Sequence, residues 1–345
     1  MRIAVCSPQV PFVRGGAEIL AERLVAELRA RGHESELVTV PFKWYPRARV
    51  LTQAFLWRML DLEESDHQRI DAVVATKFPA YVVRHPRKVA WVLHQFRSAY
   101  ELDRSEIGQF GESAEDRAVR RAIHRLDEVA LGEARALFAT SANVADRLRR
   151  SVGIEAEVLP HPPQELDYRC EEYGDFLLSV GRLNRAKRVD LLLEALARDK
   201  SLRCVVAGEG PERPALEELV ARRGLDGRVE FAGRVDEEAL AGLYARCLAV
   251  YYAPIDEDFG MVPYEAFLSR KPVVTTTDAG GPLEVVADRR TGLVCRADPA
   301  ELAAACRWLR EHPEDARAWG EAGRKLAERV SWDQVVERLV EAAGR

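Results

Sequence analysis

Short apolar runs alternate with longer amphipathic stretches along the chain. In the first half, RIAVCS (2–7) is typical of a strand, and AEILAERLVAELRARGH (17–33) predicts an amphipathic helix ending at Gly32. The same alternation returns in the second half with FLLSVG (176–181) and VDLLLEALARD (189–199). Fully apolar strands that alternate with helices indicate an α/β protein, in which helices cover both faces of a parallel sheet.

One stretch interrupts this alternation. PHPPQELDYRCEEYGD (160–175) contains three prolines and is typical of a linker. A chain of 345 residues usually forms about two domains. We therefore predict two doubly wound, Rossmann-like domains of parallel sheet, split near residue 165 and facing an interdomain cleft.

Composition and charge are those of an ordinary soluble globular protein. The hydrophobic fraction is 47%, the charged fraction is 31% and the formal net charge is −5. Residues 1–165 contain 24 Lys and Arg and 23 Asp and Glu, which leaves 27 of the 51 basic and 33 of the 56 acidic residues for the rest. Neither half is basic enough for a nucleic-acid footprint, so we expect no nucleic-acid partner.

Cysteine usage and hydropathy favour a cytoplasmic protein. The six cysteines form no Cys-x-x-Cys pair, and Cys6, Cys204 and Cys247 lie in or beside apolar runs, as reduced core residues do. The opening MRIAVCS is typical of a strand rather than of a signal peptide. We also find no run of about 18 apolar residues that would predict a transmembrane helix.

Ligands of doubly wound sheets bind in the loops beyond the carboxyl ends of the strands. Six such loops stand out because they contain glycine, which lets a backbone approach a ligand closely, or charged side chains. They are VRGGAEIL (13–20), SVGRLNRAKRV (179–189), VVAGEGPER (205–213), EFAGRVDEE (230–238), EDFGMVPYE (257–265) and TTDAGGPLEVV (276–286).

The fifth of these loops sets two carboxylates around a predicted helix start. If the chain turns at Gly260 and the helix begins near Val262, Pro263 falls in the first turn, where its missing N–H costs nothing. Glu257 then lies on the loop and Glu265 inside the helix. The helix N-terminus has free N–H groups and a partial positive charge, which suit an anion. The stretch predicts a pocket with two acceptor side chains around an anion site.

Six stretches, in their order and spacing, resemble the retaining nucleotide-sugar glycosyltransferases of family 4. They are GGAE, GRLNRAKRVDLLLEA, VVAGEGPE, EDFGMVPYEAF, KPVVTTTDAGGPLEVV and SWDQVVERL, densest over residues 178–292. The resemblance implies the GT-B fold, with two Rossmann-like domains and the active site between them. We expect an acceptor-side domain over 1–165, a nucleotide-sugar-binding domain over 166–328, and a C-terminal helix over 329–345 that packs back on the first domain.

The resemblance also implies an activity. Such an enzyme moves a hexose from a nucleoside-diphosphate sugar to a hydroxyl of a glycan, lipid-linked or small-molecule acceptor and retains the anomeric configuration. The HQFR loop (94–97) has no Asp or Glu that could serve as the base of an inverting enzyme. The donor would be UDP- or GDP-linked, and the sequence EDFGMVPYEAF resembles that of GDP-mannose users slightly more closely. The nucleotide sugar is a substrate, so we expect no cofactor.

The matched positions suggest a role for each candidate side chain. Arg182 and Lys187 would bind the donor diphosphate and neutralise the leaving group, so we expect activity without metal. Glu265 would accept hydrogen bonds from the ribose, and Glu257 would bind hydroxyls of the donor sugar near the reacting carbon. His94 would orient the transferred sugar or assist the acceptor proton.

Other candidates act through backbone or loop position. Gly15 and Gly16 would form the phosphate-side loop of the first domain. The backbone N–H groups at the helix start predicted near Val262 would meet the sugar and diphosphate; they belong to Phe259, Gly260, Met261 and Val262. The nucleotide base would be bordered by Gly208, Glu209, Arg234 and Val235.

Three positions depart from the family pattern. Arg270 stands where a helix-ending glycine is usual, so a left-handed cap there would cost about 1 kcal/mol. Arg188 follows Lys187 where glycine is usual, and PHPP (160–163) replaces the usual Pro-Asn-Gly. None of these changes removes a chemical group expected at the site.

Several alternatives stay open. A nucleotide-sugar 2-epimerase would share the diphosphate pocket without an acceptor site, and a donor-binding subunit could have lost transfer. A dinucleotide oxidoreductase is disfavoured because no G-x-G-x-x-G follows the first strand. In the first domain, which we expect to bind the acceptor, FKWYPRARVLTQAFLWRML (42–60) mixes aromatic and basic residues. It is either a peripheral membrane contact or, as we favour, a helix packed on the sheet with arginines pointing outward.

Overall fold

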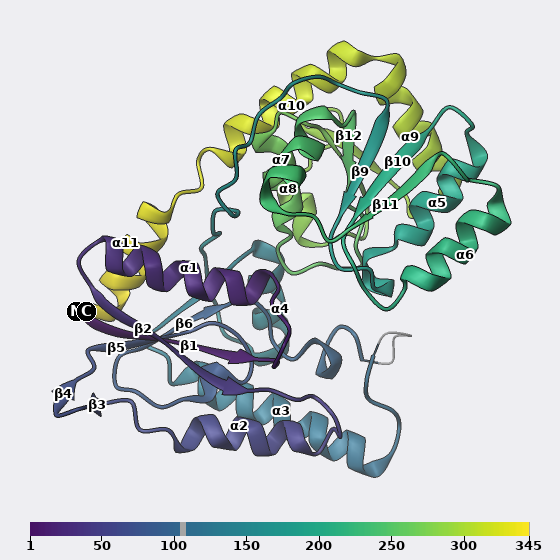
Figure 1. Cartoon of the computed structure of the whole chain (residues 1–345). Coiled ribbons are helices and arrows are strands. Elements are labelled where there is room, and N and C mark those ends of the chain that lie inside the picture. Colours follow the sequence, from purple (N-terminus) through teal and green to yellow (C-terminus); the bar gives the residue numbers. More distant parts are fainter. Residues whose placement is uncertain (104–107, 345) are drawn as a thin grey trace. The chain divides into compact units, whose positions relative to one another are not determined.

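The structure is a computed structural model that describes residues 1–103 and 108–344. It divides into two compact units, unit 1 (Met1–His161 and Ser331–Arg345) and unit 2 (Pro162–Val330). The boundaries predicted after residues 165 and 328 lie within four residues of these divisions. Each unit is a parallel sheet with helices on both faces, which confirms the predicted doubly wound α/β class (Figure 1).

Unit 1 has a six-stranded sheet in the order β2-β1-β5-β6-β7-β8. Its strands are β1 (Arg2–Gln9), β2 (Glu34–Pro41), β5 (Ala72–Ala75), β6 (Lys88–Val92), β7 (Ala136–Ala139) and β8 (Glu157–Val158), and a separate hairpin is formed by β3 (Glu64–Ser65) and β4 (Gln68–Arg69). Its helices are α1 (Gly16–Ala30), α2 (Arg49–Met59), η1 (Ala80–Val82), η2 (Arg97–Ala99), α3 (Ala114–Gly132), α4 (Ala142–Val152) and α11 (Trp332–Gly344).

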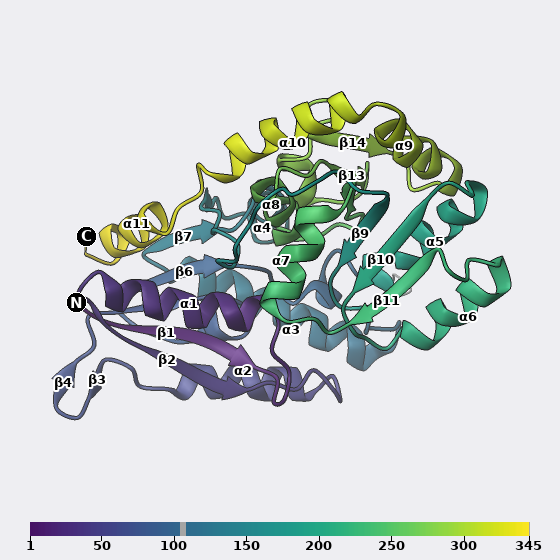
Figure 2. The same ribbon diagram turned by 45° about the horizontal axis from the view of Figure 1, so that its top comes forward.

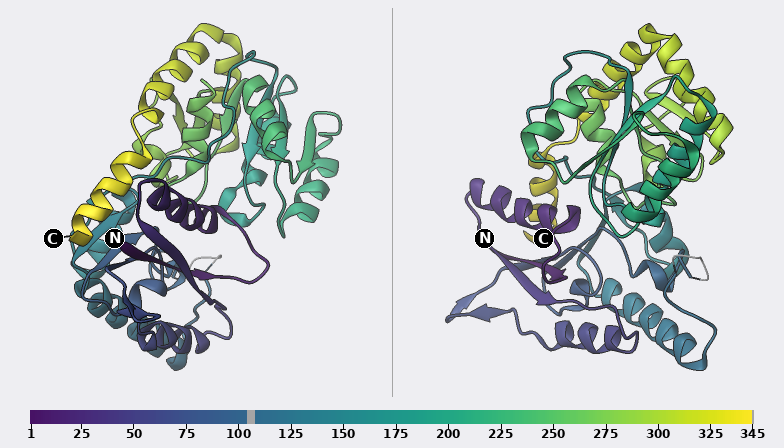
Figure 3. Two further views of the ribbon diagram at one scale, coloured as in Figure 1. Left: turned by 60° about the vertical axis from the view of Figure 1, so that its left-hand side comes forward. Right: turned by 45° about the vertical axis from the view of Figure 1, so that its right-hand side comes forward.

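The apolar strands of unit 1 supply both faces of its sheet, because successive side chains of a strand point to opposite sides. Ile3 and Val5 of β1 pack with α1 and α11, whereas Ala4 and Cys6 pack with α2, α3 and α4. The C-terminal helix α11 therefore completes the core of unit 1, and it returns the C-terminus close to the N-terminus (Figure 3).

Unit 2 has a second six-stranded parallel sheet, in the order β11-β10-β9-β12-β13-β14. Figure 2 shows β9, β10 and β11 of this sheet side by side. Its strands are β9 (Phe176–Val180), β10 (Arg203–Ala207), β11 (Val229–Gly233), β12 (Ala249–Tyr251), β13 (Val273–Thr276) and β14 (Gly292–Cys295). Its helices are η3 (Arg185–Lys187), α5 (Val189–Arg198), α6 (Arg213–Arg223), α7 (Glu237–Arg246), α8 (Met261–Leu268), η4 (Gly281–Glu284), α9 (Pro299–Glu311) and α10 (Pro313–Ala327).

The strand order reverses once in each sheet, between β1 and β5 in unit 1 and between β9 and β12 in unit 2. At such a switch point the loops leave neighbouring strands in opposite directions, which creates a crevice at the carboxyl ends. In unit 2 the loop after β9 contains Lys187 and the loop after β12 contains Glu257. The fold therefore places both predicted site residues at the position where doubly wound sheets bind ligands.

Both arginines that replace family glycines adopt left-handed backbone conformations. Arg270 has φ 57° just beyond α8, and Arg188 has φ 50° and ψ 44° between η3 and α5. Arg270 therefore has the positive φ at which an arginine is less favourable than the usual glycine. Within the described part of the chain, no helix combines the length and apolar character needed to cross a membrane.

Candidate active site

Three polar side chains meet at the switch point of unit 2. The Lys187 Nζ donates a hydrogen bond of 2.9 Å to the Tyr252 Oη and forms an ion pair with the Glu257 Oε2. The Tyr252 hydroxyl donates to the same Glu257 oxygen at 3.2 Å. The side chains of Lys187 and Glu257 are only 22% and 18% exposed. The loops after β9 and β12 thus meet in a partly buried cluster of a cation, a phenol and a carboxylate.

The surroundings fix the charges of this cluster. Burial lowers the pKa of the Lys187 ammonium, but its contacts with Tyr252 and Glu257 outweigh that effect, so its pKa is raised. Burial, reinforced by the neighbouring Glu257 carboxylate, raises the pKa of the Tyr252 phenol. Lys187 is therefore charged and Tyr252 neutral at physiological pH. A fixed cation at the carboxyl edge of the sheet suits an anionic ligand.

The loop after β13 positions the backbone of Glu257. The Glu257 N–H donates to the Ala279 carbonyl at 2.8 Å, and the Glu257 carbonyl accepts from the Gly281 N–H at 2.8 Å. A Cβ atom on Gly281 would lie 2.6 Å from the Asp258 carbonyl oxygen, closer than any side chain tolerates. Glycine at 281 is therefore needed for the two loops to approach each other.

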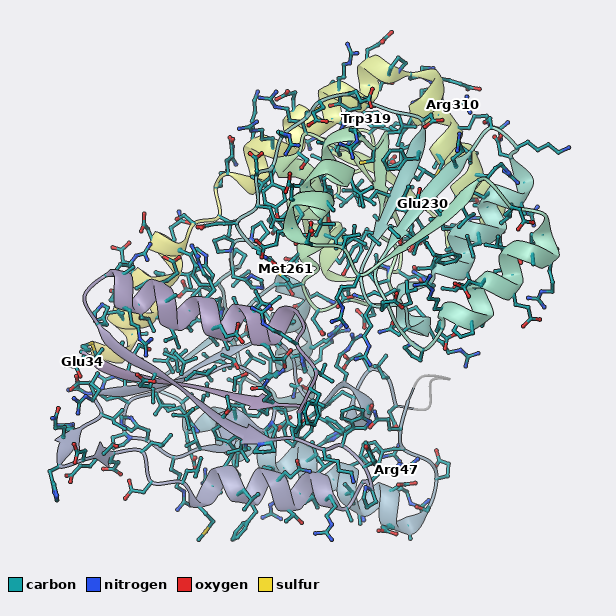
Figure 4. All side chains as sticks on the ribbon, in the orientation of Figure 1. Glu34, Arg47, Glu230, Met261, Arg310 and Trp319 are labelled. Atoms are coloured by element: carbon teal, nitrogen blue, oxygen red, sulfur yellow. The ribbon has the colours of Figure 1, made fainter. Side chains whose placement is uncertain are left out.

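Glu265 lies inside α8, as the sequence predicted, but it has a partner of its own. The helix begins at Met261 (Figure 4), one residue before the predicted start, after Gly260 with φ 82°. Glu265 is 8% exposed, and its Oε2 accepts a hydrogen bond of 2.6 Å from the Tyr244 hydroxyl. Burial raises the pKa of the Glu265 carboxyl, and the bond from Tyr244 offsets part of that effect.

The two predicted diphosphate cations have unlike surroundings. Lys187 belongs to the cluster described above, whereas Arg182 is exposed on the loop after β9. The Arg182 guanidinium has no hydrogen bond or ion pair to any residue that the structure describes. Its exposed position fits a side chain that would contact a ligand, but no contact brings it to Lys187.

The glycines of the β10 loop are explained by close backbone contact. Gly208 has φ 141°, and a Cβ there would lie 2.0 Å from the Gly181 carbonyl oxygen. A Cβ on Gly210 would lie 2.1 Å from the Leu183 carbonyl oxygen. These glycines allow the β10 loop to pack against the β9 loop.

The remaining base-site candidates surround that loop. Glu209 forms an ion pair with Arg213 of α6. Arg234 is exposed and Val235 half-buried in the loop after β11, the strand next to β10. Phe259 is 8% exposed and stacks on Tyr264 with a centroid distance of 5.0 Å.

In unit 1, Gly15 and Gly16 open α1 at that unit's switch point. Gly15 has φ −136°, which any residue adopts, so no backbone requirement explains this glycine. Its N–H donates to the Glu18 Oε2 at 2.9 Å, and the Glu18 Oε1 accepts from the Lys77 Nζ at 2.8 Å. A carboxylate thus already occupies the helix N-terminus where a phosphate-side loop was expected.

His94 follows β6 in unit 1 and is half-buried. Its Nδ1 lies 2.7 Å from the Gln95 carbonyl oxygen. Because a carbonyl can only accept, Nδ1 carries the proton, which makes Nε2 the acceptor nitrogen of the neutral ring. This tautomer is compatible with orienting a sugar hydroxyl.

Four polar side chains beside the predicted residues were not expected from the sequence. They are Tyr252 beside Lys187, Tyr244 beside Glu265, and the pair of Glu18 and Lys77 beside Gly15. Two signals were available: Lys77 directly follows the apolar run DAVVAT, and Glu18 stands three residues after the Gly15 cap, where a capping box has its acid. The tyrosines gave no signal apart from the strand end of LAVYYAP.

Known proteins resemble both units. Residues 169–326 match the family model described as Glycosyl transferases group 1. The human alpha-1,3/1,6-mannosyltransferase ALG2 is 30% identical over 196 residues, which cover 51% of this chain and 47% of that protein. The D-rhamnosyltransferase WbpZ of Pseudomonas aeruginosa is 27% identical over 91% of this chain and 77% of its own. The chain therefore spans about half the length of ALG2 and more of WbpZ.

A solved structure extends the similarity to the whole fold. The sucrose-phosphate synthase of Thermosynechococcus elongatus superposes with a TM-score of 0.81 over 99% of this chain and 98% of its own, at 18% identity. That likeness shows the GT-B fold. The family resemblance is thus confirmed over residues 169–326, where four of the six motifs lie, and the chain is a GT-B protein with a group 1 glycosyl transferase domain at these residues.

Proposed function

We propose that this protein is a retaining hexosyltransferase that uses a nucleoside-diphosphate sugar as donor. The observation that supports this proposal most strongly is the cluster of Lys187, Tyr252 and Glu257 at the switch point of unit 2. A charged lysine there can bind the diphosphate of a donor, and a carboxylate beside it can accept hydrogen bonds from the sugar hydroxyls. Relatives whose names denote mannosyl and rhamnosyl transfer support the same reaction class.

Each group has a distinct task in this proposal. Lys187 neutralises the negative charge that develops on the leaving nucleoside diphosphate, and Arg182 adds a second, exposed cation. The free N–H groups at the start of α8, after Gly260, approach the sugar and the diphosphate. Glu257 binds the hexose, whose ring gains positive charge in the transition state, and Glu265 binds the ribose.

We propose a UDP- or GDP-linked donor, with GDP-mannose favoured, and transfer with retention of the anomeric configuration. The sequence of residues 257–267 and the similarity to the mannosyltransferase ALG2 support the mannose donor. Retention is supported by the family resemblance and by the HQFR loop, which offers no carboxylate base. NMR of the early product decides the configuration, and an inverted linkage would contradict the assignment.

We propose transfer without a divalent metal because Lys187 and Arg182 supply the positive charge. The sequence does contain an Asp-x-Asp pair, Asp256 and Asp258 on either side of Glu257, and such oxygen ligands can bind Mg²⁺ or Mn²⁺. Metal independence therefore rests on the two cations and not on a lack of acidic pairs. Turnover that disappears in EDTA and returns with Mn²⁺ would show that a metal is required.

The central experiment mixes the protein with UDP- and GDP-hexoses and measures free nucleoside diphosphate, with and without sugar acceptors. A thermal-shift panel of UDP, GDP, ADP and their sugars first identifies the base. Acceptor-dependent release of the diphosphate is the expected result. Epimerisation of the donor would indicate a 2-epimerase, and binding without release or epimerisation would indicate a silent donor-binding subunit. The matched control is Lys187→Ala, which should weaken binding of the diphosphate.

We also propose that unit 1 binds the acceptor and touches an anionic lipid surface through α2. The favoured packed helix is present, because Val50, Ala54 and Trp57 of α2 are buried in the core of unit 1. Its outer face, however, exposes Phe55, Leu56 and Met59 by 61%, 47% and 66%. All charged side chains of residues 42–60 are basic, which complements anionic lipid headgroups.

Vesicle sedimentation tests this contact. We expect the protein to bind vesicles that contain an anionic phospholipid and to bind neutral vesicles much more weakly. Replacing Phe55 and Met59 by Glu should abolish vesicle binding without lowering the thermal stability. Equal recovery of the wild type and this variant with the vesicles would contradict the proposal.

A further inference from the structure

Arg188, next to the lysine that we propose binds the donor diphosphate, adopts a strained backbone conformation. Arg188 has φ 50° and ψ 44°, between η3 and α5. This left-handed region is unfavourable for a residue with a Cβ, whereas glycine occupies it freely. A residue that keeps such a conformation needs compensating interactions from its side chain or its surroundings.

The Arg188 side chain makes five hydrogen bonds, which we call the Arg188 network. Two reach backbone carbonyls after β12, from Nε to Ala253 at 2.7 Å and from Nη2 to Pro254 at 2.8 Å. Two more join Nη1 and Nη2 to the carboxylate oxygens of Asp278, each at 2.8 Å, and the last joins Nη2 to the Thr276 Oγ1 at 2.7 Å. The Arg188 side chain is only 13% exposed and Asp278 is 51% exposed, so the bonds to Ala253, Pro254 and Thr276 are better protected from water than the two to Asp278.

The network connects the three loops that surround the proposed sugar site. Arg188 itself follows Lys187, and its carbonyl accepts a hydrogen bond of 2.7 Å from the Tyr251 hydroxyl at the end of β12. Ala253 and Pro254 begin the segment that leads to Glu257. Asp278 and its neighbour Ala279 accept backbone hydrogen bonds from Asp256 and Glu257, at 2.9 and 2.8 Å.

The fork of a guanidinium is suited to this task. Its five N–H donors lie in one rigid plane, so a single side chain fixes several acceptors relative to one another. A lysine ammonium at 188 could not reproduce the paired bonds to Asp278, and a glycine would fit the backbone but make none of them. The network therefore fixes the loop of Glu257 relative to the loop of Lys187.

We propose that Arg188 is a positioning residue for sugar transfer, which sets the placement of Glu257 beside Lys187. This inference rests on the proposed transferase function. Arg188 acts through the loops, since the hydrogen bonds of its guanidinium go to Ala253, Pro254, Thr276 and Asp278. Its loss should therefore lower turnover while the affinity for the nucleoside diphosphate, which depends on Lys187, changes little.

Three substitutions separate backbone from side chain. Arg188→Gly removes both the strain and the network, Arg188→Ala removes the network and keeps the strain, and Arg188→Lys keeps the charge without the fork. We expect Arg188→Gly and Arg188→Ala to lower kcat about tenfold or more, with Arg188→Lys between them and the wild type. The affinity for the nucleoside diphosphate should weaken by no more than about threefold in all three. Arg188→Gly should unfold at a higher temperature than Arg188→Ala, because glycine accepts φ 50°.

Arg289 provides a matched control. It also has a left-handed backbone, with φ 53°, but it is exposed and its guanidinium lies over the Trp308 ring. Arg289→Gly thus makes the same chemical change in the same backbone conformation without touching the network. It should leave kcat unchanged.

Two further measurements make the inference falsifiable. Hydrogen exchange should become faster at the amides of residues 255–258 and 278–281 in Arg188→Ala, but not at those of β10. In a double-mutant cycle, Arg188→Ala should lower kcat less than twofold once Glu257 is already Gln, since both changes act through one group.

Unchanged hydrogen exchange in these loops would overturn the inference whatever the activity. Full additivity of Arg188→Ala with Glu257→Gln, or a kcat equal to that of the wild type, would overturn it as well. If the wild type releases no diphosphate from any donor, the transferase proposal fails, while hydrogen exchange still decides whether Arg188 fixes the loops.

Discussion

The ion pair between Lys187 and Glu257 leads to a counter-intuitive expectation for Glu257→Gln. Without ligand, the Lys187 ammonium is shared between the Glu257 carboxylate and the Tyr252 hydroxyl. A donor diphosphate must either use the remaining N–H of the ammonium or displace Glu257 from it. Replacing the carboxylate by a neutral amide removes this competitor. We therefore expect the variant to bind nucleoside diphosphate at least as tightly as the wild type.

The structure sets the size of the effect. A hydrogen bond to a charged group contributes about 1.5–3 kcal/mol, and the two side chains are 22% and 18% exposed, so we take solvent screening to reduce that value to roughly half. If the diphosphate displaces Glu257 completely, removing the competitor tightens binding by up to about tenfold, and if the two anions share Lys187, the gain is near zero. Turnover should move the other way and fall about 10- to 100-fold, because in the proposed reaction Glu257 contacts the sugar as its charge develops.

Titration calorimetry with the nucleoside diphosphate and steady-state kinetics with the donor measure these two quantities separately. The matched control is Tyr252→Phe, which removes the other partner of Lys187 without removing a charge. A Kd that weakens more than about threefold in Glu257→Gln would refute the reasoning, because it would mean that Glu257 contributes to diphosphate binding. An unchanged kcat would show that Glu257 does not contact the sugar in the transition state.

Three further predictions concern unit 2. Glu265→Gln should weaken the binding of donor and of nucleoside diphosphate alike, by about 1.5–3 kcal/mol, and should raise KM more than it lowers kcat, because the ribose does not change during transfer. A kinetic assay in which only kcat falls would argue against a ribose contact. Burial raises the pKa of the Glu265 carboxyl above its usual 4.5, so its contribution to stability is fully present below about pH 4.5 and is lost as the pH rises through the folded-state pKa. Thermal unfolding of Glu265→Gln, which cannot ionise, should therefore depend less on pH between 4.5 and 8 than that of the wild type. Gly208→Ala should destabilise the protein by about 1–3 kcal/mol or more, because its Cβ would lie 2.0 Å from the Gly181 carbonyl oxygen, whereas Gly132→Ala, with no atom within 4 Å, should not, as denaturant unfolding can show.

The sequence determined the local structure and the places where chemistry could occur. The alternation of apolar and amphipathic stretches predicted the parallel sheets, because burial on both faces requires fully apolar strands. Gly260 and Pro263 predicted the start of α8 to within one residue, because each has a backbone preference that acts locally. The motifs also located Lys187, Glu257 and Glu265, since each stands at a fixed distance from a strand end or helix start.

Tertiary structure alone decided which of these groups contact one another. Lys187 and Glu257 are 70 residues apart, and their ion pair exists because the strand order places β9 beside β12. The same holds for the bonds of Arg188 to Asp278, 90 residues away, and for the pairing of Glu18 with Lys77 in unit 1. Hydrophobic periodicity reports which face of an element is buried and carries no information on which strand lies next to it. The chemistry of the site depends on that neighbour, so it became visible only once the strands were in their order.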